Sequence, residues 1–347
     1  MGATMRLRPA GVSLLVMAVL VLGAAAPFQA ALHDDPLAVF VPANRARIES
    51  GAVVVEVLTE HGDDFAVAGA VKTTADGRRL VAWSREIEAL QRGKYVPLIQ
   101  RFSAIPKAED LSALVLDDDD LEDLRDCRPG RCGVKLASHE IRQISETIEA
   151  AGADWRTAAQ QAFRAVVLAR ARAHLAGGYR AMATYDDQKR AANPSTEFAR
   201  LLARCEPDSL AAPEVTRYFR AYPQADPQVE SFLYWSKDVL GDAKPIISIT
   251  HLAIFHGEPR GEPAIVAAAQ VFASHYVQAS LSLTSVVSRP GDDTRYLTYL
   301  RRSRVDVFQR SFGGLIRRMV QKRVRAEGPP VLDAFRRNLE SGLRGAS

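Results

Sequence analysis

Strand signals near the C-terminal end of the chain constrain its fold more than any other feature. Residues 245–256, 264–287 and 294–304 are rich in apolar and β-branched side chains, and turns with Gly and Pro separate them. Residues 264–287 contain neither Gly nor Pro and exceed the usual length of a strand. We therefore expect a bend or bulge near residues 274–277. Consecutive strands joined by short turns predict an antiparallel sheet.

A second group of strand signals lies nearer the N-terminus. Residues 53–58 and 65–71 flank a Gly-Asp turn signal, so they predict a hairpin. Residues 79–90 then show apolar side chains at helical spacing, and residues 95–102 predict another strand.

A helix with one apolar side follows the last predicted strand. Apolar side chains recur every three or four positions over residues 312–324. We expect Leu315, Ile316 and Met319 to face the sheet. The Gly-Pro-Pro sequence at residues 328–330 is expected to interrupt the helix, because proline lacks the N–H that a helix interior needs.

Residues 106–242, between the two groups of strand signals, are polar and are predicted to be helical. Short stretches show apolar side chains at helical spacing, and prolines separate them. The acidic run at residues 117–120 lacks the alternating ligands, central Gly and terminal Glu of an EF-hand calcium loop. Carboxylates favour helix N-termini, so this run predicts the start of a helix. One later helix should end at Gly177-Gly178.

Residues 1–30 have the layout of a secretory signal peptide. Arg6 and Arg8 precede an apolar stretch, and small residues follow it. An uncleaved N-terminal anchor is the alternative, because no charged residue occurs from Pro9 to Leu32. Either interpretation predicts a periplasmic or otherwise exported protein, and export argues against nucleic acid as a partner.

Cys127 and Cys132 enclose a Pro-Gly turn, which can bring their two thiols together. In an oxidising compartment this arrangement predicts a small disulfide loop. Free thiols and a metal site are the alternatives, but His139 is the only nearby candidate for a further metal ligand. Cys205 lies on an apolar helical pattern and is expected to be a buried thiol.

These blocks predict an α+β fold. Their order resembles the START-like helix-grip fold, also called the SRPBCC superfamily. The resemblance rests on residues 51–71, the helix around Trp83, the strands between residues 245 and 304, and the helix at 312–324. It implies a bent antiparallel sheet that grips a long C-terminal helix, here with a mostly helical insert. Short segments such as Tyr234-Trp235-Ser236-Lys237 also resemble a bacterial exported family.

This resemblance suggests a division of the chain into four parts. Residues 1–30 are the signal peptide or anchor, and residues 31–105 are the first part of the helix-grip domain. Residues 106–242 are the helical insert, and residues 243–347 are the second part of the domain with the C-terminal helix.

The last predicted hairpin supplies candidate ligand contacts. If its turn is centred after Pro290, Leu281 faces Leu300. The even-numbered residues of the last strand then lie on the same face of the sheet as the odd-numbered, apolar residues of the strand before it. The polar side chains on that face are Tyr296, Arg302 and Arg304. If the face lines a cavity, an inward Arg needs an anionic partner, either an internal carboxylate such as Asp306 or a ligand. A register change of one residue would turn both arginines outward.

His251, His275 and Tyr276 are the other candidates for contact with a ligand. His251 should pair with about residue 269, which places His275 about 20 Å farther along the sheet, so one site holding both is not expected. A hydrogen-bonded histidine in the core is the alternative to an acid–base catalyst. No nucleophile elbow, phosphate loop, dinucleotide fingerprint or zinc-protease motif occurs in the sequence. We therefore predict no catalytic residue, no cofactor and no metal ligand.

The patterns together predict an exported protein that binds a hydrophobic or amphiphilic, lipid-like small molecule between the sheet and the C-terminal helix. An enzyme acting on such a ligand, or an interaction protein that uses the helical insert, are the alternatives. Residues 289–347 contain fourteen basic and six acidic residues. This surplus adds the hypothesis of peripheral contact with an anionic membrane surface, with a solvated helix face as the alternative.

Overall fold

The computed structural model describes most of the chain after residue 34. The described residues are 35–58, 64–205, 213–224, 226–239, 243–256, 264–288, 291, 293–309 and 312–341. The predicted signal peptide and the side chain of Cys205 lie outside the described residues.

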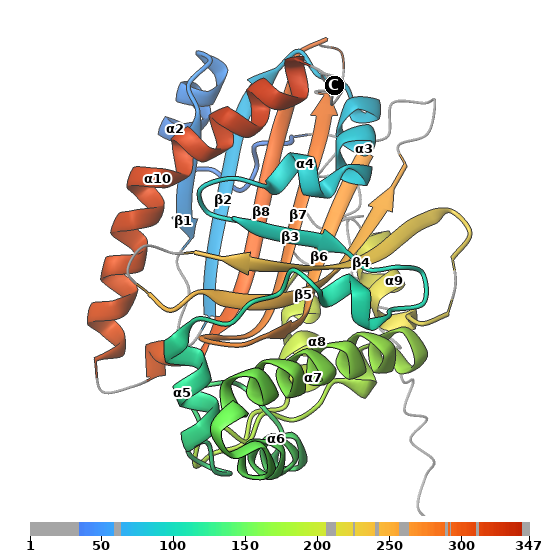
Figure 1. The fold of residues 1–347 in the computed structure, drawn as a ribbon. Coiled ribbons are helices and arrows are strands. Elements are labelled where there is room, and N and C mark those ends of the chain that lie inside the picture. Colours follow the sequence, from blue (N-terminus) through green and yellow to red (C-terminus); the bar gives the residue numbers. More distant parts are fainter. Residues whose placement is uncertain are drawn as a thin grey trace, which may run out of the picture.

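An eight-stranded antiparallel sheet forms the centre of the molecule (Figure 1). The strands are β1 (Val54–Leu58), β2 (Asp64–Thr73), β3 (Leu98–Arg101), β4 (Val229–Asp238), β5 (Ile246–Phe255), β6 (Ala264–Ala273), β7 (Val277–Ser288) and β8 (Arg295–Val305). Their order is β1-β2-β8-β7-β6-β5-β4-β3, so β2 and β8, from opposite ends of the chain, are neighbours. In Figure 1, β4 and β5 run crosswise to β2, β8 and β7, which shows how strongly the sheet twists.

Helices surround this sheet, which confirms the α+β prediction. They are α2 (Pro42–Glu49), α3 (Gly77–Arg85), α4 (Ile87–Gln91), α5 (Asp118–Asp126), α6 (Ser138–Ala151), α7 (Trp155–Gly177), α8 (Pro194–Cys205), α9 (Pro213–Ala221) and α10 (Gly313–Ser341). Two short 3₁₀ segments directly follow α7 and β8: η4 (Gly178–Ala181) and η5 (Asp306–Gln309). As predicted, α5 begins within the acidic run, and α7 ends at Gly177, with Gly178 at φ +62°.

The two faces of the sheet pack against different helices. One face packs against α2, α8 and α9 in a core that includes Tyr296 and Phe219. The other face packs against α3, α4 and the C-terminal half of α10 in a core that includes Leu297 and Leu332. We call this second face the grip face. Helices α5, α6 and α7 lie at one end of the sheet and cover the ends of β4, β5 and β6 on the first face (Figure 1).

Residues 264–287 form two strands rather than the single bent strand that the sequence predicts. The chain reverses at Ser274–Tyr276, and Tyr276 takes a left-handed backbone conformation with φ 58°. Such a conformation is uncommon outside Gly, so the turn carries no Gly or Pro signal. Contacts with other segments hold it: the Tyr276 carbonyl accepts from Asp306 N, and its hydroxyl accepts from Lys244 N.

The segment predicted as the helical insert also contains a strand. The described residues between 118 and 221 are mainly helical, as predicted, but β4 (Val229–Asp238) pairs with β3 and β5 within the sheet. The side chains of Phe232, Tyr234 and Trp235 are all buried although they lie on both faces of this strand, because helices or loops cover each face. Without period-two alternation such a run carries no clear strand signal.

The C-terminal helix differs from the prediction in two respects. Pro329 and Pro330 lie inside α10, which continues through them. Leu315 and Met319 are 53% and 64% exposed, so only Ile316 of the three predicted residues packs inward. Leu332 and Leu339 are the buried side chains of this helix.

Two glycines allow α10 to approach the β1–β2 hairpin closely. A Cβ at Gly69 would lie 2.9 Å from Leu332 Cδ2, and a Cβ at Gly328 would lie 2.8 Å from Val55 Cγ1. These contacts fix the helix at residues 328–332, next to the prolines. Tight packing there stabilises a helical turn that the prolines alone would disfavour.

We predict that Leu332→Ala lowers the free energy of unfolding by about 2–5 kcal/mol, because it leaves a cavity between α10 and β2. Leu315→Ala is the matched control in the same helix and should change it by no more than about 0.5 kcal/mol. Urea denaturation followed by circular dichroism measures both. Equal effects of the two substitutions would show that the packed side of α10 is wrongly assigned.

Candidate functional site

The last hairpin forms as predicted, with its register displaced by two residues. Leu281 pairs with Arg302, and Leu283 pairs with Leu300. A displacement by an even number leaves each side chain on its predicted face. Arg302 therefore lies on the face that α8 covers, opposite the grip face.

The side chains predicted to bind a ligand on this face have partners within the protein. Tyr296 is 1% exposed and belongs to the core. Arg304 Nη1 lies 2.6 Å from Asp64 Oδ1, and its Nε lies 2.6 Å from Glu197 Oε2. These carboxylates neutralise a guanidinium that is largely buried. Arg302 is partly exposed. The ligand-binding role of these residues stays a prediction.

His251 lies in a buried cluster of aromatic rings. It pairs with Ala269, as the sequence predicts. His251 Nδ1 is 3.1 Å from His174 Nε2, and its Nε2 is 3.2 Å from the Tyr218 hydroxyl. Burial lowers the pKa of His174 to about 3 and that of His251 well below its ordinary value. Both rings are therefore neutral at physiological pH, as expected for hydrogen-bonded core histidines.

These buried histidines predict a loss of stability in mild acid. Below about pH 6.5 the unfolded chain protonates both rings while the folded protein keeps them neutral, so stability falls as the pH falls. When the pH is lowered from 7.5 to 5.5, the free energy of unfolding should fall by about 1.4 kcal/mol less in His251→Gln than in the wild type. His139→Gln, at an exposed position, should behave like the wild type. An identical pH dependence in all three proteins would contradict a neutral buried His251.

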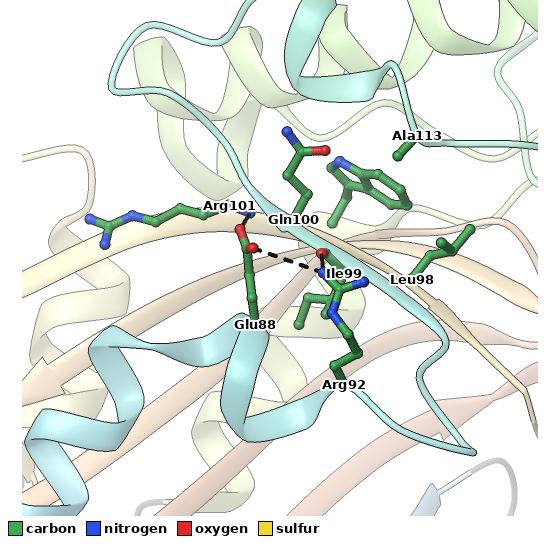
Figure 2. Close-up of a pocket in the computed structure, with 8 residues that line it drawn as sticks. Glu88, Arg92, Leu98, Ile99, Gln100, Arg101 and Ala113 are labelled. Atoms are coloured by element: carbon green, nitrogen blue, oxygen red, sulfur yellow. Dashed lines mark hydrogen bonds and ion pairs between the residues drawn. The ribbon is translucent and has the colours of Figure 1, made fainter. Parts of the chain in front are cut away.

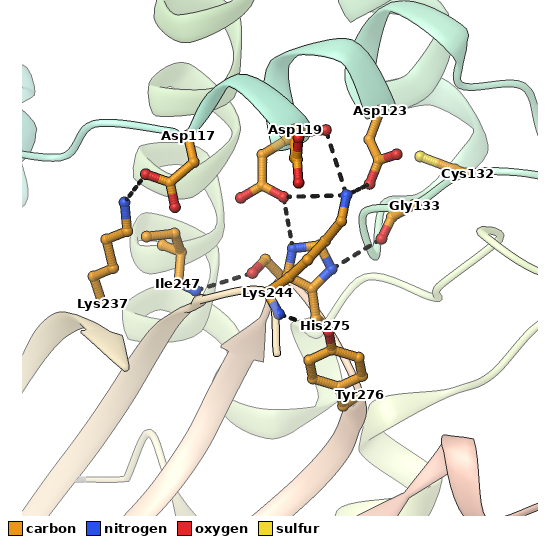
Figure 3. A network of polar contacts seen from close by, with 12 residues as sticks. Asp117, Asp119, Asp123, Cys132, Gly133, Lys237, Lys244, Ile247, His275 and Tyr276 are labelled. Carbon is orange, nitrogen blue, oxygen red and sulfur yellow. Dashed lines mark hydrogen bonds and ion pairs between the residues drawn. The ribbon is translucent and has the colours of Figure 1, made fainter. Parts of the chain in front are cut away.

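His275 belongs to a different cluster, as predicted, where it contacts the acidic helix α5 (Figure 3). Its Nδ1 lies 2.9 Å from Gly133 O, and its Nε2 lies 3.1 Å from Asp120 Oδ1. Asp120 is 2% exposed, so this contact lies away from solvent. Lys244 Nζ adds an ion pair with Asp123 at 2.6 Å.

This network attaches the helical region to the sheet. Helix α5 contributes Asp120, and the turn between β6 and β7 contributes His275. Nearby, Lys135 is 3% exposed, lies 3.8 Å from Asp187 and also pairs with Asp306 of η5. Asp306, a suggested partner for Arg302, therefore pairs with a lysine of the helical region. The cluster is an anchor of buried, compensated charges.

The disulfide between Cys127 and Cys132, predicted from the sequence, is present next to this anchor. Gly130 has φ 82°, and Arg131 N donates to Arg128 O at 2.8 Å, which forms the predicted turn. The loop is held in place because Cys132 N donates to Asp187 O at 2.9 Å.

We predict that His275→Ala lowers the free energy of unfolding by about 1–3 kcal/mol, because the buried Asp120 carboxylate loses its hydrogen bond and, among the described residues, keeps only Lys244 Nζ, at 4.0 Å. His139→Ala, which removes an exposed histidine, is the control. Chemical denaturation measures both. An unchanged midpoint for His275→Ala would show that Asp120 does not depend on this ring.

The grip face carries a row of polar side chains that crosses five strands. From β4 to β8 the row contains Tyr234, Thr250, Gln270, Ser280 and Ser303. Tyr234 pairs with Thr250, Thr250 with Gln270, and Ser280 with Ser303. Gln270 and Ser280 are the residues next to the pair Ala269–Leu281 on β6 and β7. Polar side chains in the middle of a large sheet are unusual core material, so this row is a candidate site.

Arg301 projects from β8 beside this row. It is exposed, although it lies in the middle of a central strand. Its Nε is 3.3 Å from Ser303 Oγ, and its Nη2 is 3.4 Å from Ser280 Oγ. Within the part of the chain that the structure describes, no carboxylate forms an ion pair with it at 4.0 Å or less.

The electrostatic state of the row is set by burial and by Arg301. Burial raises the pKa of Asp238, while the charge of Arg301 and the hydroxyls of Ser236 and Ser248 oppose that rise. Burial also raises the pKa of the Tyr234 phenol to about 12, so Tyr234 stays a neutral donor. The region thus combines one exposed cation with neutral hydroxyls and amides and with the buried Asp238 carboxyl.

A small hollow of about 220 Å³ lies at the outer edge of β3 (Figure 2). Here α4 covers the edge of the sheet: the Glu88 carboxylate accepts from Arg101 N at 2.8 Å, and Arg92 Nη2 donates to Ile99 O at 2.9 Å. The two side chains replace a missing neighbouring strand and protect the edge from pairing with another chain. The volume of this hollow is below the range typical of ligand pockets.

Sequence reasoning missed the Arg301 region because it assigned the cavity to the apolar face. On β7 the odd-numbered residues Ala279, Leu281 and Leu283 alternate with polar even-numbered ones. That alternation indicates one apolar and one polar face. The polar face is the partly accessible one, and Arg301 rather than Arg302 shares it.

Comparisons with known proteins add no further assignment: no family model, no curated protein and no solved structure matches the chain. Among the described residues, no group of three or more His, Cys, Asp or Glu side chains is arranged to hold a metal ion. Within the same residues, no helix has both the length and the apolar character needed to cross a bilayer.

Proposed function

We propose that the grip face binds an amphiphilic small molecule whose anionic head group contacts Arg301. The observation that carries this proposal is an exposed guanidinium in the middle of a central strand, hydrogen-bonded to two serine hydroxyls. A carboxylate or phosphate accepts bidentate, charge-assisted hydrogen bonds from such a group. The Gln270 amide supports the proposal, because its Nε2 is buried without a hydrogen-bond partner among the described residues.

The surroundings of Arg301 favour an amphiphile over a simple anion. Two residues before Arg301 on β8, Tyr299 is partly exposed and packs with the core under α10. Leu332 and Phe335 of α10 belong to that core or pack against it. A head group at Arg301 would therefore have its apolar chain beside Tyr299 on the grip face, next to the residues that pack under α10.

The element order is compatible with a START-like helix-grip domain, and we retain that family as part of the proposal. From β2 onward the chain runs through two short helices, six further strands and a long C-terminal helix, with an inserted helical region after β3. Export to the periplasm, with the N-terminal segment as signal peptide or anchor, is likewise proposed from the sequence. Both are consistent with a carrier or sensor of lipid-like molecules.

The pair Arg301→Met and Arg302→Met tests this proposal, because adjacent side chains of one strand lie on opposite faces. Arg301→Met should keep the fold, since Arg301 is exposed, and weaken binding by about 2 kcal/mol, roughly thirtyfold, through loss of charge-assisted hydrogen bonds. Arg302→Met is the matched control and should bind like the wild type. The measurements are thermal denaturation, mass spectrometry of co-purifying molecules, and titration with a fluorescent long-chain fatty acid.

Two results would contradict the proposal. One is equal retention of the co-purifying molecule by both variants. The other is loss of that molecule in Arg302→Met alone with the fold intact, which would place the head group on the opposite face, as the sequence first suggested.

A further inference from the structure

Only part of the apolar stripe of α10 is packed in its N-terminal half. The packed part faces β1, β2 and η5 and consists of Ile316, Val320 and Val324. Beside it lies an exposed part, which we call the outer stripe: Leu315 and Met319 of the helix and Phe312 just before it, which are 53%, 64% and 74% exposed. Packing against the sheet does not account for these large exposed apolar side chains.

Cations surround the outer stripe. Residues 312–326 contain five Arg or Lys and no Asp or Glu. Arg318, Lys322 and Arg325 are exposed, and helical spacing places Lys322 one turn beyond Met319. Arg318 Nε donates to Gly314 O of its own helix, so its charge is not balanced by that contact. The outer side therefore combines large apolar side chains with positive charge.

The position of α10 makes this side accessible. The helix lies along the flank of the sheet next to β1, at the edge of the molecule (Figure 1). Its packed side is fixed at Gly69, Gly328 and Leu332, and Leu315 and Met319 stay exposed beside that packed side.

We propose that this outer side of α10 rests on an anionic lipid membrane. Phe312, Leu315 and Met319 would enter the boundary between head groups and acyl chains, and the surrounding cations would contact lipid phosphates. This combination is typical of helices that lie in a membrane interface. The proposal does not depend on the ligand site at Arg301.

The test is flotation of the full-length protein with vesicles of phosphatidylglycerol and phosphatidylcholine, compared with phosphatidylcholine alone. We expect binding to the anionic vesicles that weakens with added salt. Leu315→Gln combined with Met319→Gln should weaken it by at least about tenfold, because apolar area is no longer buried. Lys322→Gln combined with Arg325→Gln should weaken it about twenty-five-fold, since each cation near the surface contributes about fivefold.

Matched controls separate α10 from the rest of the protein. Ile105→Gln removes an apolar side chain that is 81% exposed elsewhere, and Arg78→Gln removes a cation whose side chain is 95% exposed. Both should bind like the wild type, and every variant keeps the same N-terminal segment. Equal binding by all variants, or binding by none including the wild type, would overturn the proposal. Self-association that Leu315→Gln abolishes would also overturn it, because the stripe would then bind a second copy.

Discussion

The pairing of β2 with β8 is the interaction on which the rest of this structure depends. Ten residue pairs, from Asp64–Arg304 to Thr73–Arg295, join the first hairpin of the chain to its last strand. This ladder joins a strand that precedes the inserted helical region to one that follows it. It also determines the face on which each side chain of β8 lies. Arg301 lies opposite Val67 and Arg302 opposite Ala66, so the ladder places them on different faces.

Two kinds of contact hold the surrounding helices to that sheet. On the grip face α10 is fixed by close apolar packing at Gly69 and Gly328. The helical region packs on the sheet through an apolar core of its own and is also fixed by buried charges, in which His275 contacts Asp120 and Lys135 contacts Asp306. Buried ion pairs of this kind contribute little net stability compared with apolar side chains of similar volume. Removing one partner is nevertheless costly, because the other charge is left buried, so such pairs favour one arrangement of the helical region.

The two proposed surfaces occupy different parts of the molecule. Arg301 lies on the grip face of the sheet, while Phe312, Leu315 and Met319 lie on the outer side of α10. The same helix borders both, because its C-terminal half covers the apolar end of the proposed ligand site and its N-terminal half carries the outer stripe. A membrane-bound orientation through α10 would therefore place the ligand site close to its lipid supply.

Local periodicity and turn chemistry were sufficient to predict the α+β class, the bounds of β1, β2, β5 and β8 to within two residues, the disulfide turn and the pairing of His251 with residue 269. The sequence also recorded the polar alternation on β7. Only the tertiary structure decided which face of the sheet stays accessible, that Ser274–Tyr276 is a turn, and that α10 continues through Pro329 and Pro330. Those outcomes depend on contacts between distant segments, such as Asp306 with Lys135 and Leu332 with Gly69, and local pattern contains no information about them.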